Sequence, residues 1–352
     1  MTVLVLIVAA GGAAWYGTHA DSHRSGSHIT IDRQVWVSGL DGRVTAMANI
    51  PNGGFVIAGY QKTGWAVATD AQGNLLWKYI APFDENLGLG TPASTHSEFY
   101  GVVPLPNGNV LLCGQKTTEK LDTVGLITIL SNTGLLLEER QVLANKDRDY
   151  SVPTFGGKIY GCSRWDDGVA LIGGKLDNSE KPPAWAIKLD GSAEKKWEKL
   201  LVAGSQWTRP ILVIDRDLVL AHVEVKPTTT EFTIEKWNET GEAVAKSAPI
   251  TGKYPYLFRS FQSEHEIGLM AYFDVSNTYQ LHVLGERLEQ VGRPKQVRVN
   301  NFDLQEGFGY RLPDHSLLLF GRSATQSGDR GSIERIGKDG EYLDLLVFPQ
   351  IL

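Results

Sequence analysis

Aromatic and arginine side chains recur where the short apolar runs of this sequence begin, and they are the residues best suited to binding chemistry. Rings and guanidinium groups are enriched at the energetic centres of protein interfaces. On a chain of formal net charge −6, such a cluster would form a local basic and aromatic surface suited to an acidic protein partner. The candidate partner-binding residues are Tyr100, Arg148, Tyr150, Trp207, Arg209, Tyr256, Arg259, Phe308 and Arg311.

Signatures of catalysis and of metal or cofactor binding are absent from the sequence. His265 and Glu266 lack the second histidine at the zinc-protease spacing, and there is no Gly-x-Ser-x-Gly, phosphate loop or Gly-x-Gly-x-x-Gly. The acidic pair Asp166 and Asp167 could suggest glycosidase carboxylates, but adjacent carboxylates in a turn are usually solvated. We therefore predict no catalytic residue, no metal site and no cofactor. The net negative charge, without a Lys/Arg stripe, also excludes a nucleic-acid partner.

Short strands must position the candidate residues, and they are clearest between residues 98 and 144. The first two apolar runs of this stretch meet at Pro-Asn-Gly (106–108), which tolerates positive φ and closes a tight hairpin. The second run, 110–113, lacks alternation, as in a strand buried on both faces. The fourth run carries Glu138, Glu139 and Arg140, and such charge belongs at a solvent-facing edge. The stretch is predicted to be a four-stranded antiparallel meander, apolar inside and polar outside.

The same pattern occurs six times, with its first turns 49 to 59 residues apart. A period of roughly 40–50 residues with four strands per unit is typical of a β-propeller blade. A closed ring also hides inner edges that a β-sandwich or open solenoid would leave free. We predict an all-β fold: a single six-bladed β-propeller of four-stranded antiparallel blades, residues 29–352, preceded by an N-terminal hydrophobic segment. The predicted blades span residues 45–82, 98–144, 158–203, 207–250, 256–300 and 308–352.

The loops of such a meander divide between two faces. Connectors between units and loops between second and third strands are long and share one face, whereas the tight turns lie on the other. Function concentrates on loops held by a rigid scaffold, so the long-loop face is the predicted binding face. The candidate residues enter their strands around its channel mouth. Either they bind a partner, or they cap the channel with the arginines paired to Asp147, Asp149 and Glu306. A hydrolase or lyase, or a glycan-binding module, with its site at this mouth is the alternative function.

The N-terminal region predicts export. Residues 2–17 form a long apolar run without charge, slightly short for a spanning helix of about 20 residues. Residues 1–20 are either a membrane anchor or a signal peptide cleaved after Ala20, and residues 21–28 form a polar linker. Both interpretations place the propeller in the periplasm or another extracytoplasmic space. The strand 29–37 is predicted to close the ring by pairing with the last blade, near residues 343–348.

Two cysteines and several recurrent tryptophans remain. An even cysteine count permits a disulfide in an exported protein, but Cys113 and Cys162 fall in adjacent blades and nothing guarantees bonding distance. We favour two buried free thiols, which behave as small hydrophobes. The tryptophans near third and fourth strands are predicted to pack between blades. They are Trp77, Trp185, Trp197 and Trp237.

Several segments resemble quinoprotein (PQQ-like) propeller repeats of exported bacterial proteins. They include TDAQGNLLWKYI (69–80), KLDGSAEKKWEKLL (188–201), PNGGFVIAGY (51–60) and PNGNVLLCGQ (106–115). That superfamily contains pyrroloquinoline quinone dehydrogenases and a non-enzymatic scaffold of outer-membrane protein assembly. The dehydrogenases carry eight blades, a vicinal cysteine pair and calcium ligands, whereas this chain has no adjacent cysteines. The resemblance therefore implies the scaffold branch: an exported, membrane-tethered propeller that binds a protein as a scaffold or inhibitor.

Overall fold

The computed structural model contains strands and no helices in the residues that it describes. No helix of the described ranges is therefore long and apolar enough to cross a membrane. The described residues are 2–5, 35–38, 43–51, 53–60, 62–83, 96–117, 123–142, 157–174, 184–202, 207–214, 216–225, 229–252, 256–263, 266–272, 278–298, 302–311, 316–325 and 328–347.

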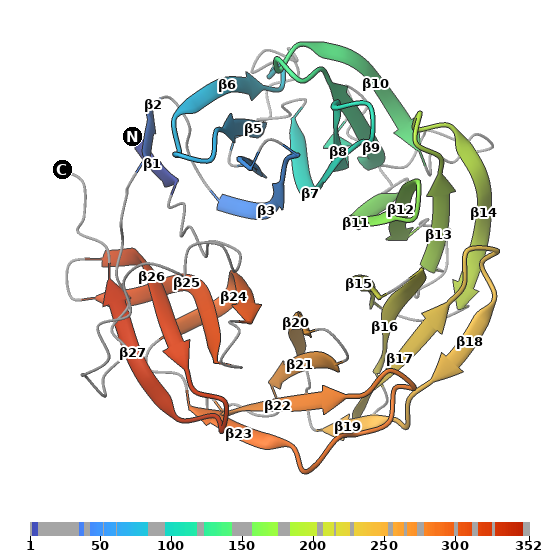
Figure 1. Ribbon diagram of the computed structural model, residues 1–352, viewed down its shortest axis with the longest axis vertical. Coiled ribbons are helices and arrows are strands. Elements are labelled where there is room, and N and C mark those ends of the chain that lie inside the picture. The colour runs from blue at the N-terminus through green and yellow to red at the C-terminus, as the bar shows by residue number, and fades with distance from the viewer. Residues whose placement is uncertain are drawn as a thin grey trace, which may run out of the picture.

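The sheets stand side by side around a common centre (Figure 1), and we number these blades along the chain. Blade 1 contains β3 (Arg43–Asn49), β4 (Phe55–Tyr60), β5 (Gly64–Thr69) and β6 (Leu75–Ile80). Blade 2 contains β7 (Ser97–Pro104), β8 (Val110–Thr117), β9 (Thr123–Leu130) and β10 (Leu136–Val142). Blade 3 contains β11 (Lys158–Trp165), β12 (Gly168–Gly174), β13 (Ala184–Leu189) and β14 (Lys195–Val202).

The second half of the chain repeats this arrangement. Blade 4 contains β15 (Trp207–Ile214), β16 (Asp217–Val225), β17 (Thr230–Trp237), β18 (Ala243–Lys246) and the additional β19 (Ile250–Gly252), which pairs with β17. Blade 5 contains β20 (Tyr256–Ser263), β21 (Glu266–Tyr272), β22 (Thr278–Leu284) and β23 (Lys295–Arg298). Blade 6 contains β24 (Phe302–Arg311), β25 (Leu317–Thr325), β26 (Gly328–Ile336) and β27 (Tyr342–Val347).

Each blade is an antiparallel meander whose strands pair in chain order. The first strand of each lies nearest the centre of the ring and the fourth lies toward the rim (Figure 1). The all-β class and the four-stranded antiparallel sheets are confirmed, and the described strands form six sheets of this kind, one with the additional strand β19. The Asn-Gly hairpin of blade 2 forms as predicted, since Gly108 has a φ of 85° and its N–H donates to the carbonyl of Leu105 at 3.0 Å.

The N-terminal strands pair differently from our expectation. β1 (Thr2–Val5) and β2 (Val35–Ser38) form a separate two-stranded antiparallel sheet, with Thr2 opposite Ser38. Among the described residues β27 pairs with β26 alone, so Val35–Ser38 does not extend the last blade. Both strands contain two valines, and β-branched residues favour β-strands. Residues 6–34, with most of the predicted anchor and the linker, lie outside the described residues.

The hydrophobic core lies between neighbouring blades. One cluster joins Leu105, Leu111 and Ile127 of blade 2 to Ile159 and Leu171 of blade 3, all at most 3% exposed. Equivalent clusters lie between blades 1 and 2, between blades 3 and 4, and between blades 4 and 5. Continuous apolar runs in the second strands are therefore explained, because both faces of each of these sheets meet a neighbour.

Outer strands hold the turn of the next blade. The indole ring of Trp77 lies against Gly134, and Trp197 Nε1 donates to the carbonyl of Glu239 at 3.2 Å. Blade 2 makes the equivalent contact with an arginine instead of a tryptophan, because Arg140 Nη1 donates to the carbonyl of Ala193 in the turn of blade 3 at 2.7 Å. Lys199 Nζ likewise donates to the backbone carbonyls of residues 240 and 241, and Lys295 Nζ donates to the carbonyl of residue 338. The tryptophans of β6 and β14 pack between blades, as predicted.

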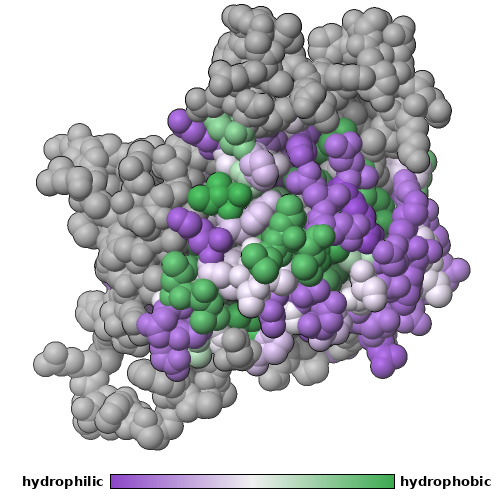
Figure 2. Space-filling view, turned by 90° about the horizontal axis from the view of Figure 1, so that it is seen from above, coloured by the Kyte–Doolittle hydropathy of each residue, from purple (hydrophilic) through white to green (hydrophobic). Residues whose placement is uncertain are grey.

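The rim is more apolar than the sequence analysis predicted. Leu75 and Leu76 of β6 are 47% and 49% exposed, and Leu135 before β10 is 68% exposed. Figure 2 looks onto a side of the ring and shows apolar side chains scattered between polar ones. Leu75 and Leu76 open the outer edge strand β6, and Leu135 directly precedes the outer edge strand β10. The predicted charged residues do lie in the outer strand of blade 2, but exposed leucines accompany them, which the sequence analysis did not predict.

Replacement of Gly134 by alanine is expected to destabilise the ring through its contact with Trp77. Gly134 has a φ of 81°, and a Cβ there would lie 2.8 Å from the indole ring. Gly108 has a φ of 85°, but its Cβ would meet nothing closer than 4.0 Å. G134A should therefore lower the free energy of unfolding by roughly 1–2 kcal/mol more than G108A, measured by denaturant titration. Equal losses in the two variants would show that the contact with Trp77 contributes nothing.

A buried carboxylate joins the strands of blade 4. Glu235 Oε2 lies 3.0 Å from His222 Nε2 and accepts from Trp237 Nε1 at 3.1 Å, while Glu235 Oε1 accepts from Lys246 Nζ at 2.9 Å. Glu235 and His222 are 8% and 7% exposed. Hydrogen bonding from His222 lowers the pKa of Glu235 to about 2, with help from Lys246 and Trp237 and against the effect of burial. His222 is thus a packed histidine of the blade core.

Candidate functional site

Polar and aromatic side chains gather where β7 begins, on the face that carries the long loops. We call Tyr60, His96, Glu98, Tyr100 and Gln115 the Glu98 cluster. Tyr60 ends β4, Glu98 and Tyr100 lie near the start of β7, and Gln115 lies on β8 directly opposite Glu98. His96 immediately precedes β7. The cluster therefore spans the junction between blades 1 and 2 at a strand entry, where the sequence predicted a binding surface.

Hydrogen bonds fix the Glu98 carboxylate in place. Gln115 Nε2 donates to Glu98 Oε2 at 2.7 Å, and the Tyr100 hydroxyl donates to the same oxygen. His96 Nε2 lies 3.4 Å from the other oxygen, Glu98 Oε1. The ring of Tyr60 meets the ring of Tyr100 edge to face, with centroids 5.6 Å apart and planes at 87°. The Glu98 side chain is 17% exposed, so the carboxylate is largely enclosed but still reaches solvent.

The cluster keeps its carboxylate ionised at neutral pH. Burial of Glu98 raises its pKa, but hydrogen bonds from His96, Tyr100 and Gln115 and the charge of His96 together outweigh burial. The pKa of Glu98 is therefore lower than that of an ordinary glutamate. The result is a fixed negative charge, flanked by two phenol rings, at the inner end of a loop face.

A β-bulge in the innermost strand shapes this site. The register of β7 against β8 shifts between Phe99 and Gly101, which leaves Tyr100 as the extra residue. The same one-residue shift recurs at Thr45 in blade 1, at Tyr160 in blade 3 and in the first strands of blades 4 and 5. The first strand of blade 6 has a larger irregularity, between Asp303 and Phe308. Bulges re-aim side chains and are frequent beside functional sites. The sequence analysis predicted none of them.

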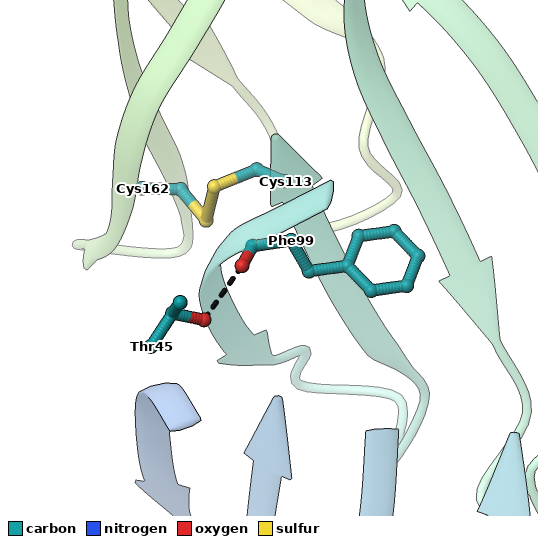
Figure 3. The surroundings of a disulfide bond; sticks show 4 residues. All are labelled: Thr45, Phe99, Cys113 and Cys162. Carbon is teal, nitrogen blue, oxygen red and sulfur yellow. Dashed lines mark hydrogen bonds between the residues drawn. A yellow bond between two sulfur atoms is a disulfide. The ribbon is translucent and has the colours of Figure 1, made fainter. Parts of the chain in front are cut away.

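Phe99 and its carbonyl anchor the strand to blade 1. The ring of Phe99 is fully buried and lies 6.4 Å from the ring of Tyr79. Thr45 Oγ1 donates to the carbonyl of Phe99 at 2.6 Å across the blade junction (Figure 3). Gly64 permits this packing, because a Cβ there would lie 2.7 Å from the Phe99 ring. The backbone that carries Glu98 and Tyr100, on either side of Phe99, is thus held in place.

A disulfide anchors the same blade to blade 3. Cys113 of β8 bonds to Cys162 of β11, with Cα atoms 6.2 Å apart (Figure 3). The prediction of two free thiols is therefore wrong. Cys113 belongs to the buried cluster between blades 2 and 3 and Cys162 packs against it, which spacing alone did not show. Gly101 makes room for the bond, because a Cβ there would lie 2.6 and 2.7 Å from the two sulfur atoms.

The predicted partner-binding residues fall into four groups. Tyr100 belongs to the Glu98 cluster. Trp207, Arg209, Tyr256 and Arg259 have backbone positions in the first halves of β15 and β20, consistent with strand entry. Phe308 lies within β24, opposite Phe320, and Arg311 is the last residue of that strand. Arg148 and Tyr150 lie outside the described residues.

Arg311 corrects one part of the expected surface. It pairs with Leu317 next to the hairpin that joins β24 to β25. β24 is ten residues long and begins at Phe302, earlier than the sequence analysis placed it. At roughly 3.3 Å per residue, the strand separates its two ends by most of the blade height. Arg311 therefore lies at the tight-turn end of blade 6 and not at the channel mouth on the loop face.

Four residues of the cluster escaped the sequence analysis, namely Tyr60, His96, Glu98 and Gln115. The Pro-Asn-Gly turn gave no sufficient signal for Glu98 and Gln115, because the register that it sets would place Lys116 opposite Glu98. The bulge at Tyr100 shifts the register by one residue and brings Gln115 opposite Glu98. His96 carried no signal either. No group of three or more His, Cys, Asp or Glu that could hold a metal ion occurs within the described ranges.

Comparison with known proteins identifies the architecture. No protein-family model matches the chain, and no curated protein matches its sequence. Among solved structures, BBS1N in complex with ARL6DN superposes with a TM-score of 0.50 at 7% identity, over 89% of this chain and 83% of that one.

The fold is a β-propeller.

Two further propellers are similar in the same range. The periplasmic gluconolactonase PpgL of Pseudomonas aeruginosa has a TM-score of 0.49 at 11% identity, over 86% of this chain and 84% of that one. The Dos1 propeller has a TM-score of 0.48 at 10% identity, over 88% and 71%. Identities this low relate the chain to a fold and leave its activity to be argued from its own site.

Proposed function

We propose that this chain is a protein-binding propeller that recruits its partner at the loop face around the Glu98 cluster, as a scaffold or an inhibitor. The Glu98 cluster is the observation that carries the proposal. Two tyrosines, a histidine and an ionised carboxylate sit at a strand entry, and the backbone beneath them is tied to blade 1 by Thr45 and Phe99. Tyrosine adds large contact area at low entropic cost, which suits a recognition surface.

The disulfide supports export. Disulfides persist in oxidising compartments and are rare in the reducing cytosol. The bond between Cys113 and Cys162 therefore agrees with the sequence-based interpretation of residues 2–17 as an anchor or signal. In our proposal the propeller is held in the periplasm or another extracytoplasmic space, tethered to the membrane by its N-terminal segment.

The partner is proposed to carry charges of both signs. Arg209 of β15 and Arg259 of β20 belong to innermost strands. Because of these two arginines, we still expect part of the partner to be acidic. In blade 2, the Glu98 carboxylate near the start of β7 adds a negative charge to the proposed surface. Complementary charges fix orientation and suppress incorrect partners more than they add affinity. A partner with both signs would therefore bind in one orientation.

Site-specific photo-crosslinking tests the proposal. A benzoylphenylalanine at position 100 is expected to cross-link the partner in cells that express the full chain. The same group at position 76, on the exposed rim of blade 1, is the matched control, because Leu76 lies on a fourth strand away from the mouth. The measurement is the identity and yield of cross-linked protein at each position.

The cross-linking outcomes separate the two surfaces. A product at position 100 and none at position 76 supports recruitment at the loop face. A product at position 76 alone would move the partner to the leucines of the rim, and no product at either would overturn protein binding by blades 1 and 2.

One observation favours a second candidate function, a hydrolase or lyase at the channel mouth. His96 Nε2 lies 3.4 Å from the Glu98 carboxylate, and a carboxylate that orients an imidazole is a common acid–base arrangement. Turnover of an ester, lactone and polysaccharide panel tests this candidate. Activity lost in H96N and retained in the control E239Q would establish catalysis, whereas absence of turnover across the panel would reject it.

A further inference from the structure

The Glu98 carboxylate combines the features of a receptor for a cation. It is a fixed charge, because Gln115 and Tyr100 donate to one oxygen and His96 approaches the other. A carboxylate has about four lone-pair sites, and these three neighbours leave one for a ligand. The side chain is 17% exposed, so an incoming group meets a partly desolvated charge, where attraction is stronger than in bulk water.

The two tyrosine rings add a second attraction for positive charge. Tyr60 and Tyr100 are partly exposed and stand edge to face, 5.6 Å apart. A T-shaped pair presents the face of one ring beside the edge of the other, and ring faces attract Lys and Arg cations at up to about 6 Å. The Tyr100 hydroxyl already bonds to Glu98, so this ring and the carboxylate share one site.

Gln115 supplies a third feature, an unused acceptor. Its side chain is 7% exposed, and its Oε1 has no hydrogen-bond partner among the described residues. Leaving a buried acceptor without a donor costs roughly 1–3 kcal/mol. Nε2 of the same amide is bound to Glu98, so the free acceptor belongs to the same cluster. A donor-rich group would satisfy the carboxylate and this amide together.

We propose that the Glu98 cluster binds an arginine side chain of the protein partner, with the guanidinium at Glu98 and Gln115 and beside Tyr60 and Tyr100. This inference rests on the proposed function and names the chemistry that the site recognises. Guanidinium fits better than ammonium, because its planar fork offers five donors to separate acceptors and stacks on aromatic rings. The remainder of the partner would lie over the loop face.

Binding of short peptides to the full chain tests the inference directly. The probes are acetyl-Gly-Arg-Gly-amide, the same peptide with lysine, and the same peptide with citrulline, which keeps the shape of arginine without its charge. We expect the arginine peptide to bind at least tenfold more tightly than the citrulline peptide by ligand-detected NMR or calorimetry, with lysine between them. Affinity should also fall as salt is raised, since the attraction is largely between charges.

Variants assign the preference to the cluster. E98Q should remove the difference between the arginine and citrulline peptides, whereas E239Q, which neutralises an exposed carboxylate on the outer turn of blade 4, should leave it unchanged. If E98Q fails to fold, Y60L offers a second test, because it keeps Glu98 and removes one ring. Equal binding of the arginine and citrulline peptides, or a preference that survives both E98Q and Y60L, would overturn the inference.

The two proposals fail in distinguishable ways. A cross-link from position 100 without an arginine preference would leave partner recruitment intact and reject the guanidinium. An arginine preference without any cross-link would show a cation site that serves no protein partner, and it would reject the inference as stated.

Discussion

Reduction of the Cys113–Cys162 disulfide is expected to lower the free energy of unfolding by about 4 kcal/mol. The bond closes a loop between residues 49 positions apart, and chain-entropy arguments for a loop of this size give a loss of roughly that magnitude. It also ties β8 to β11, so that blade 2 and blade 3 cannot separate while it is intact. The measurement is denaturant unfolding with and without a thiol reductant, monitored by tryptophan fluorescence.

The matched control is the double variant C113S/C162S. It should unfold like the reduced wild-type protein, and the reductant should not change it. Thiol labelling before and after reduction reports whether the bond exists. Labelling of two thiols in unreduced, unfolded protein, or identical unfolding curves with and without reductant, would contradict the expected stabilisation.

Local sequence rules predicted the blades because each rule depends on neighbouring residues. The turn at Asn107 and Gly108 requires only a tolerance of positive φ, and Gly108 shows a φ of 85°. The charged fourth run of blade 2 lies at the outer edge, where Glu138 and Arg140 remain partly exposed. Such features need no knowledge of what packs against the strand.

Features that depend on two blades at once were not predictable in this way. Whether Cys113 meets Cys162 depends on how blade 2 packs against blade 3, and no residue pattern within either blade marks that contact. The Glu98 cluster likewise needs Tyr60 of one blade beside Tyr100 of the next. Strand pairing next to a hairpin turn could be predicted from the sequence, whereas contacts between neighbouring blades could not.

The binding face was predicted in part. Tyr100 was singled out for its place at a strand entry, and it is a member of the Glu98 cluster. The neighbouring polar residues were overlooked, because the search favoured arginine and aromatic side chains. Arg311 was misplaced since the length of β24 was underestimated, so the residue near its end was taken for one near its start.

Acidification is expected to weaken blade 4 through protonation of Glu235. The pKa of this group is about 2 in the folded protein against an ordinary value of 4.5, chiefly because His222 bonds to the carboxylate. A depressed pKa means that the stabilising contribution is complete above about pH 4.5. It is lost as the pH falls toward 2, because the unfolded chain takes up the proton first. At about 1.4 kcal/mol per pKa unit, the loss is about 3 kcal/mol.

The variant E235Q isolates this contribution. Glutamine cannot ionise and leaves Lys246 and His222 beside a neutral group, so we expect a loss of roughly 3 kcal/mol at neutral pH, as for a broken buried pair. Between pH 4.5 and 2 the stability of E235Q should fall by about 3 kcal/mol less than that of the wild-type protein. E239Q, an exposed neighbour in the same blade, should follow the wild-type curve. Urea unfolding across this pH range is the measurement. Parallel curves for E235Q and the wild-type protein would show that Glu235 is not the group whose protonation weakens the ring. They would also show that His222, Trp237 and Lys246 do not lower its pKa.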